Sequence, residues 1–221
     1  MIAGGKRRGL TPEFYRNRLV TQLEAEGISD ERVLETLRRV PRHEFVDPAW
    51  DLSKAYANSA LPIGRAQTIS QPYIVALMTE ALLAGGKTRH VLEIGTGCGY
   101  QTAVLAELVD RVYSVERIRS LFERAGERLH QQGYQRIYLN HADGMAGWPQ
   151  QAPFDGIIVT AAGDEVPPAL LEQLAPGGRL IIPLGPAGAQ RLCRITRQGE
   201  RFLSEELAAV SFVPLLPETQ S

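Results

Sequence analysis

The sequence predicts an α/β fold with a mostly parallel, doubly wound sheet, a helical extension before it and an antiparallel pair of strands after it. Three observations support this prediction. Short apolar runs typical of buried strands alternate with helical patterns over residues 90–184. A glycine-rich turn joins the first run to the first helix of this region. Two further apolar runs flank Gln198-Gly199 and can pair as a hairpin.

The N-terminal part predicts three helices, over residues 11–26, 29–40 and 71–85. Each range begins with a capping or first-turn residue and has a glycine or proline at its end or directly after it, which favours a helix with those bounds. Residues 43–64 lack a helical or alternating pattern and carry scattered aromatic side chains. We expect an irregular covering loop there.

From residue 90 onward the pattern predicts βα units, and right-handed crossovers place their strands in one parallel sheet. The predicted strands cover 90–92, 111–115, 136–140, 154–160 and 179–184. The predicted helices cover 100–109, 118–132 and 167–174, and the C-terminal strands cover 191–197 and 206–213.

The turn after the first strand predicts the cofactor. Gly95, Gly97 and Gly99 can adopt positive φ and place no Cβ between the backbone and a ligand. Doubly wound folds hold nucleotide-like cofactors at this position. A dinucleotide brings a pyrophosphate anion, which the carboxylate of Glu93 disfavours, whereas the amine and sulfonium cations of S-adenosylmethionine favour it. The turn therefore predicts a Rossmann-like, S-adenosylmethionine-dependent methyltransferase fold and not an NAD site.

A second carboxylate supports this interpretation. Glu116 ends the next strand, about 20 residues beyond the glycines, where such folds contact ribose hydroxyls. The alternative, a solvated strand end, stays open. We expect residues 1–10 to be a disordered tail and 11–221 a single methyltransferase domain, with an N-terminal helical and substrate-loop region (11–89), a cofactor-binding core (90–185) and C-terminal strands with substrate contacts (186–221).

Composition limits the partners. With 24 Lys and Arg against 25 Asp and Glu, no overall charge attracts nucleic acid. No apolar run approaches the ~20 residues of a membrane span, and no signal peptide is recognisable. Cys98 and Cys193 imply neither a disulfide nor zinc, and the four histidines lack metal-ligand spacing. We therefore expect a cytoplasmic protein, a monomer, that uses no metal and binds no membrane.

Five further segments are specific enough to suggest a family. Val40–Val46, Leu61–Gly64, Gln67–Tyr73, Val159–Ala162 and Phe212–Leu215 resemble the protein-L-isoaspartate (D-aspartate) O-methyltransferase family, and the resemblance spans about residues 11–216. It implies a repair enzyme for damaged proteins. Such an enzyme methylates the α-carboxyl of L-isoaspartyl residues, and more weakly of D-aspartyl residues, to an ester that collapses to a succinimide.

The resemblance also implies roles for individual residues. The active-site serine would be Ser70, with Thr68 and Ile69 shaping the acceptor pocket. Cofactor contacts would come from Glu93, Gly95, Thr96, Gly97, Gly99, Glu116, Asp143, Gly144 and Thr160, and main-chain contacts to the substrate peptide from Val213, Pro214 and Leu215. Two positions depart from the family pattern: Ala142 stands where relatives often have glycine, and Ser211 where they commonly have arginine.

The chemistry needs no general base, because an unperturbed carboxyl titrates near pKa ~4 and is ionised at neutral pH. Ser70 precedes the predicted helix that starts at Pro72, where free N–H groups favour an anion. Its hydroxyl can orient the acceptor carboxylate, or it can merely cap that helix. The sequence leaves both roles open.

Other functions stay open as alternatives. The same methyl donor can serve a small-molecule or RNA acceptor, and a non-catalytic adenosyl-binding module would keep the donor site without turnover. An NAD-linked oxidoreductase is disfavoured by Glu93. Methylation of amino groups is disfavoured because Thr160–Gly163 replaces the Asn/Asp-Pro-Pro-aromatic turn typical of such enzymes.

Overall fold

The computed structural model describes residues 11–86 and 88–221, so the tail predicted for residues 1–10 lies outside it. Its main sheet has seven strands in the order β5-β4-β3-β6-β7-β8-β9. The strands from β5 to β7 are parallel, and β8 and β9 continue the sheet antiparallel. The strands are β3 (His90–Ile94), β4 (Arg111–Glu116), β5 (Ile137–His141), β6 (Phe154–Val159), β7 (Leu174–Leu184), β8 (Gln190–Gln198) and β9 (Arg201–Val210).

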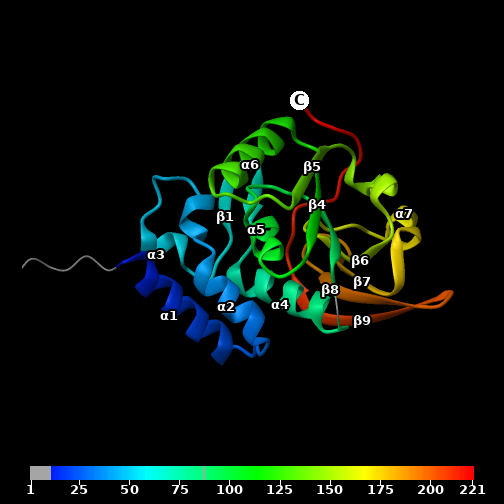
Figure 1. Cartoon of the computed structure of the whole chain (residues 1–221), viewed down its shortest axis with the longest axis horizontal. Helices are drawn as coiled ribbons and strands as arrows, with labels where there is room; N and C mark the ends of the chain where they lie inside the picture. The colour runs from blue at the N-terminus through cyan, green and yellow to red at the C-terminus, as the bar shows by residue number, and fades with distance from the viewer. Residues whose placement is uncertain (1–10, 87) are drawn as a thin grey trace, which may run out of the picture.

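Helices cover the sheet in layers. Helix α4 packs against β6 and β7, α2 packs on α4, and α1 packs on α2, as Figure 1 shows. Helices α5 and α6 pack on β4 and β5, and α7 on β7. The helices are α1 (Pro12–Ala25), α2 (Glu31–Arg39), α3 (Leu52–Ala55), α4 (Pro72–Leu83), α5 (Tyr100–Ala106), α6 (Arg119–Gln131) and α7 (Pro168–Glu172), with 3₁₀ turns η1 (Arg42–Phe45), η2 (Gly144–Ala146) and η3 (Pro149–Gln151).

Two hydrophobic cores form because neighbouring side chains of a strand point to opposite faces. Along each strand, one set of alternate residues faces α1, α2, α4 and α5. The other set faces the side covered by α7. The first core takes Val91, Val112, Ile158 and Ile181 from the strands, and the second takes Leu92, Tyr113, Ile157 and Leu180. Burial on both faces explains why these strands read as continuous apolar runs.

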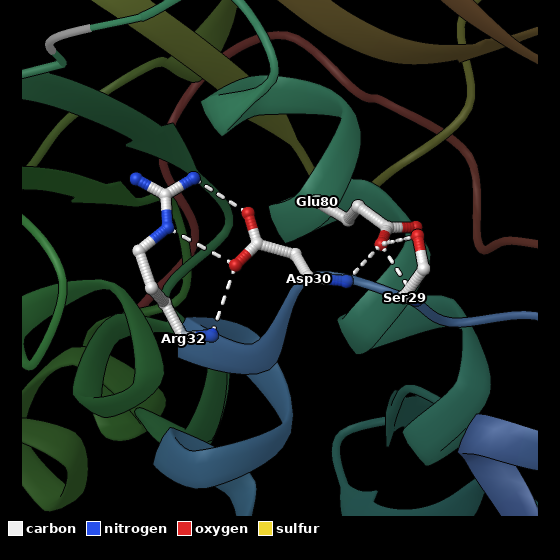
Figure 2. A network of polar contacts seen from close by, with 4 residues as sticks. All are labelled: Ser29, Asp30, Arg32 and Glu80. Atoms are coloured by element: carbon white, nitrogen blue, oxygen red, sulfur yellow. Dashed lines mark hydrogen bonds and ion pairs between the residues drawn. The ribbon is translucent and has the colours of Figure 1, made fainter.

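Polar contacts at helix ends fix the N-terminal layer. Thr11 caps α1 through its hydroxyl, and Asp30 caps α2. One carboxylate oxygen of Glu80, on α4, accepts hydrogen bonds from the backbone N–H groups of Ser29 (2.8 Å) and Asp30 (2.6 Å) and from the Ser29 hydroxyl (3.1 Å). Figure 2 shows this carboxylate facing the turn before α2, with Arg32 on the other side of Asp30. The contact ties α2 to the helix that packs on the sheet.

The predicted loop over residues 43–64 is partly wrong. It contains most of η1, then α3 and a strand, β1 (Leu61–Gly64), which pairs antiparallel with β2 (Gln67–Ile69). The fifth strand of the parallel sheet, β7, starts at Leu174 and not at residue 179 as predicted, so it includes Pro176-Gly177-Gly178. The antiparallel pairing of the two C-terminal strands through Gln198-Gly199 is confirmed.

Candidate active site

A cavity lies at the carboxyl ends of β3, β4 and β6, where doubly wound sheets bind ligands. The β1–β2 hairpin and the segment Val213–Leu216 form further walls. Twelve of the residues predicted from the sequence line this cavity: Thr68, Ile69, Ser70, Gly95, Thr96, Gly97, Glu116, Gly144, Thr160, Val213, Pro214 and Leu215. Three predicted residues, Glu93, Gly99 and Asp143, do not line it.

The glycine turn has the backbone that the sequence predicts. Gly95 and Gly97 have φ of 95° and 57°, a region in which side chains are strained. A Cβ on Gly95 would collide with the hydroxyl of Thr160, which donates hydrogen bonds to the carbonyls of Ile94 (3.0 Å) and Gly95 (2.8 Å). Gly99 is the N-cap residue directly before α5 and has a φ of 90°. Gly99 therefore shapes the turn from outside the cavity.

Glu116 is bound to the turn through both carboxylate oxygens. One accepts the N–H of Gly97 at 2.8 Å and the other the N–H of Ile118 at 2.9 Å. Only 4% of the residue is exposed. The side chain thus holds the glycine turn while lining the cavity, and each oxygen retains a lone pair for a ligand hydroxyl.

Glu93 lies beneath the turn and is fully buried. One carboxylate oxygen accepts hydrogen bonds from the hydroxyls of Thr102 (2.6 Å) and Ser114 (2.5 Å), and Ser114 is in turn bonded to Thr96 at 2.6 Å. The other oxygen has no partner among the described residues. Burial raises the pKa of Glu93 to about 8. Glu93, predicted as a cofactor contact, is not among the residues that line the cavity.

Asp143, also predicted as a cofactor contact, does not line the cavity either. It caps η2, and its carboxylate accepts the N–H of Met145 at 2.8 Å and the N–H of Glu218 at 3.0 Å. Its neighbour Gly144 does line the cavity. A Cβ on Gly144 would collide with Ile94, so glycine lets this turn approach the end of β3.

The sequence left two roles open for Ser70, capping of α4 and contact with the acceptor, and the structure does not show the capping contact. The residue at the N-cap of α4 is Gln71, and no side chain caps this helix end. In the described part of the chain the Ser70 hydroxyl makes no hydrogen bond, while the side chain lines the cavity beside Thr68 and Ile69. Its hydroxyl is therefore free to contact a ligand at the start of α4.

Backbone hydrogen bonds join the C-terminal segment, Val213–Leu216, to the residues that follow β6. Ala162, after β6, donates its N–H to Val213 (2.8 Å) and accepts the N–H of Leu215 (2.7 Å). Further along, Gln220 exchanges backbone hydrogen bonds with Arg117 (2.7 Å) and Arg119 (2.9 Å). The chain end thus runs beside the residues that join β4 to α6. It is the red trace that ends at the label C in Figure 1.

Several lining residues were not predicted, including Tyr100, Gln101, Arg117, Ile118, Leu121 and Leu216. Arg117 and Ile118 directly follow the strand end at Glu116, and that position was an available signal. Tyr100, Gln101 and Leu121 lie on helices, and Leu216 follows the Phe212–Leu215 segment. No local sequence pattern marks these positions as part of a site. Within residues 11–86 and 88–221, no cluster of three or more His, Cys, Asp or Glu side chains could hold a metal ion, and no helix is long and apolar enough to cross a membrane.

The parallel sheet, the glycine turn after β3 and the acidic end of β4 define a Rossmann-like methyltransferase. Comparison with known sequences is more specific. Residues 14–220 match the profile of the family described as protein-L-isoaspartate(D-aspartate) O-methyltransferase (PCMT). The chain therefore belongs to this family.

Individual relatives agree. A protein-L-isoaspartate O-methyltransferase of Halorhodospira halophila is 58% identical over 208 residues, covering 94% of each chain. One from Pseudomonas fluorescens is 54% identical, covering 94% of this chain and 98% of the relative.

Two solved structures share the fold. A protein-L-isoaspartate O-methyltransferase aligns with a TM-score of 0.83 and 30% identity, over 90% of this chain and 65% of that one. A putative enzyme of the same name from Plasmodium falciparum, in complex with S-adenosyl-L-homocysteine, aligns with a TM-score of 0.80 and 25% identity, over 91% and 98% of the chains.

Proposed function

We propose that this protein is a repair methyltransferase. It transfers the methyl group of S-adenosylmethionine to the α-carboxyl of L-isoaspartyl residues, and more weakly of D-aspartyl residues, in damaged proteins. The observation that carries the proposal is that one cavity, in a member of this family, joins the glycine turn after β3 to the Thr68–Ser70 segment.

The residues present fit the cofactor. Gly95, Gly97 and Gly144 carry no side chain where they line the cavity, and the carboxylate of Glu116, which also lines it, supplies negative potential toward a cation. Glu116 and Thr96 would hold the sugar and amino acid portions. When bound, S-adenosylmethionine supplies a methyl group on a sulfonium, which is electrophilic without help from the protein.

The chain's own contribution is to hold the acceptor. The carboxylate is already ionised at neutral pH, so alignment with the methyl group and exclusion of water are what remain for the protein. Ser70 would donate a hydrogen bond to the carboxylate at the start of α4, where free N–H groups also favour an anion. Thr68, Ile69 and the Val213–Leu215 backbone would hold the peptide on either side.

Methyl transfer from labelled S-adenosylmethionine to a synthetic isoaspartyl peptide tests the function, with the normal aspartyl peptide of the same sequence as the control. We expect a base-labile ester on the first peptide only, followed by its collapse to a succinimide. Equal labelling of both peptides would contradict the proposal and favour a different acceptor. Cofactor binding without transfer to any acceptor would favour the adenosyl-binding module instead.

The remaining expectations are proposed with the function. We propose that the enzyme acts as a cytoplasmic monomer on damaged proteins and peptides, without nucleic acid or membrane partners. Light scattering of the purified protein, with and without S-adenosyl-L-homocysteine, tests the monomer. A mass near 24.3 kDa is expected.

A further inference from the structure

An arginine lies fully buried next to the acceptor side of the cavity. Arg42, in η1, has no exposed surface and is among the largest fully buried side chains of the protein. No acidic side chain pairs with it in the described part of the chain. A buried cation without a carboxylate partner is costly, so its contacts need a reason beyond filling space.

The guanidinium joins three segments of backbone. Its Nε donates to the carbonyl of Ala55, at the end of α3, at 3.1 Å. Its Nη2 donates to the carbonyl of Ser59 at 3.3 Å and to that of Ser70 at 2.9 Å. The Nη2 group thus links the backbone of Ser70 to that of Ser59, which lies in the segment before β1.

The same side chain stands behind the cavity wall. Its guanidinium carbon lies 5.0 Å from the ring centroid of Tyr100, and Tyr100 lines the cavity. Its Nη1 is buried and has no hydrogen-bond partner among the described residues. The positive charge of Arg42 is therefore not fully balanced by its neighbours, and it lies close to the pocket proposed for an anion. In low-dielectric surroundings such a charge attracts an anion more strongly than it would in water.

We infer that Arg42 is a positioning residue for the acceptor: it holds the Ser70 backbone so that the hydroxyl meets the substrate carboxylate, and its charge favours an anionic acceptor. The inference rests on the proposed function. Arginine suits this role because its planar group donates in several fixed directions at once, whereas lysine presents a compact charge that cannot reach all three carbonyls.

Arg42→Lys tests the inference, since it keeps the charge but loses the fork of donors. We expect the KM for an isoaspartyl peptide to rise about tenfold, as for one lost hydrogen bond to a charged group, with the KM for S-adenosylmethionine within about twofold of wild type. Leu34→Ala, in the buried face of α2, is the control for destabilisation. It should lower the melting temperature and leave both constants within about twofold.

A double-mutant cycle with Ser70→Ala separates positioning from plain stability. If Arg42 acts through Ser70, Arg42→Lys should raise the KM for the peptide only slightly further in a protein that already carries Ser70→Ala. If the effect of Arg42→Lys is purely structural, it should raise this KM by the same factor with or without Ser70→Ala. Arg42→Gln, which retains one donor group, replaces the lysine variant if that one does not fold.

The outcomes are distinct. If the wild type does not methylate the isoaspartyl peptide, the proposed function fails. If the wild type is active but Arg42→Lys leaves the peptide KM unchanged, raises both KM values alike, or adds fully to Ser70→Ala, the inference about Arg42 is wrong.

Discussion

Polar side chains around the cavity divide into those bound by the protein's own backbone and those left free. The carboxylates of Glu116 and Asp143 accept hydrogen bonds from backbone N–H groups. The hydroxyl of Thr160 donates a hydrogen bond to a backbone carbonyl. The Ser70 hydroxyl has no such bond in the described residues. Residues of the first kind set the shape of the site, and Ser70 is available to a substrate.

Ser70→Ala should therefore affect catalysis more than stability. Loss of a hydrogen bond to a charged group costs roughly 1.5–3 kcal/mol, which predicts a fall of about 10- to 100-fold in kcat/KM for an isoaspartyl peptide. The melting temperature should stay within about 2 °C, because this hydroxyl caps no helix. Steady-state kinetics and calorimetry measure the two effects, with Ser204→Ala on exposed β9 as the control. A loss of stability without a loss of rate would restore the capping role.

Glu93 predicts a pH dependence of stability. Its pKa in the folded protein is about 8, above the ordinary value of 4.5, because it is buried. The folded state therefore holds the proton more tightly, so this group's contribution to stability is complete below about pH 4.5 and is lost as the pH rises through about 8. Glu93→Gln, which cannot ionise, should lack this loss.

Urea unfolding at pH 6 and pH 9 measures the difference. The free energy of unfolding should fall by roughly 1–3 kcal/mol more in the wild type than in Glu93→Gln over this range. Glu200→Gln, on the β8–β9 turn, controls for the loss of one negative charge. A constant difference between wild type and Glu93→Gln across both pH values would contradict the prediction.

Two short elements cover the ends of the parallel strands. The β1–β2 hairpin carries Thr68 and Ile69, and its tip is held to α6, where Arg65 donates to the hydroxyl of Ser120 at 3.0 Å and Arg124 to the carbonyl of Ile63 at 3.2 Å. The C-terminal segment covers the other side through Gln220 and Arg117. The sheet supplies the floor of the cavity, and these elements supply its walls.

Removal of residues 217–221 should weaken the cofactor side of the cavity. The deleted chain end carries the hydrogen bonds to Arg117, Arg119 and Asp143, beside Ile118 and Gly144 of the lining. We expect the Kd for S-adenosylmethionine to rise about tenfold, since several modest hydrogen bonds are lost together. Removal of Ser221 alone, which keeps Gln220, is the control. Isothermal titration calorimetry measures both, and equal affinities would show that the segment does not support the site.

At the scale of the whole molecule, periodicity predicted the sheet because buried parallel strands and capped helices leave strong local patterns. The β1–β2 hairpin left none: Arg65 and Ala66 occupy the left-handed region, with φ of 55° and 56°, where a turn normally has asparagine or glycine. Local patterns also do not tell whether a strand-end carboxylate faces a cavity. Glu116 does, while Glu93 points beneath the turn and Asp143 toward Glu218.

The cavity takes its walls from segments far apart in the sequence, Thr68–Ser70 and Val213–Leu216. A polypeptide still emerging from the ribosome consequently has only part of a pocket, however well its parallel sheet has folded. Cleavage of the chain before Val213 would likewise remove one wall of the cavity together with its backbone hydrogen bonds to Ala162.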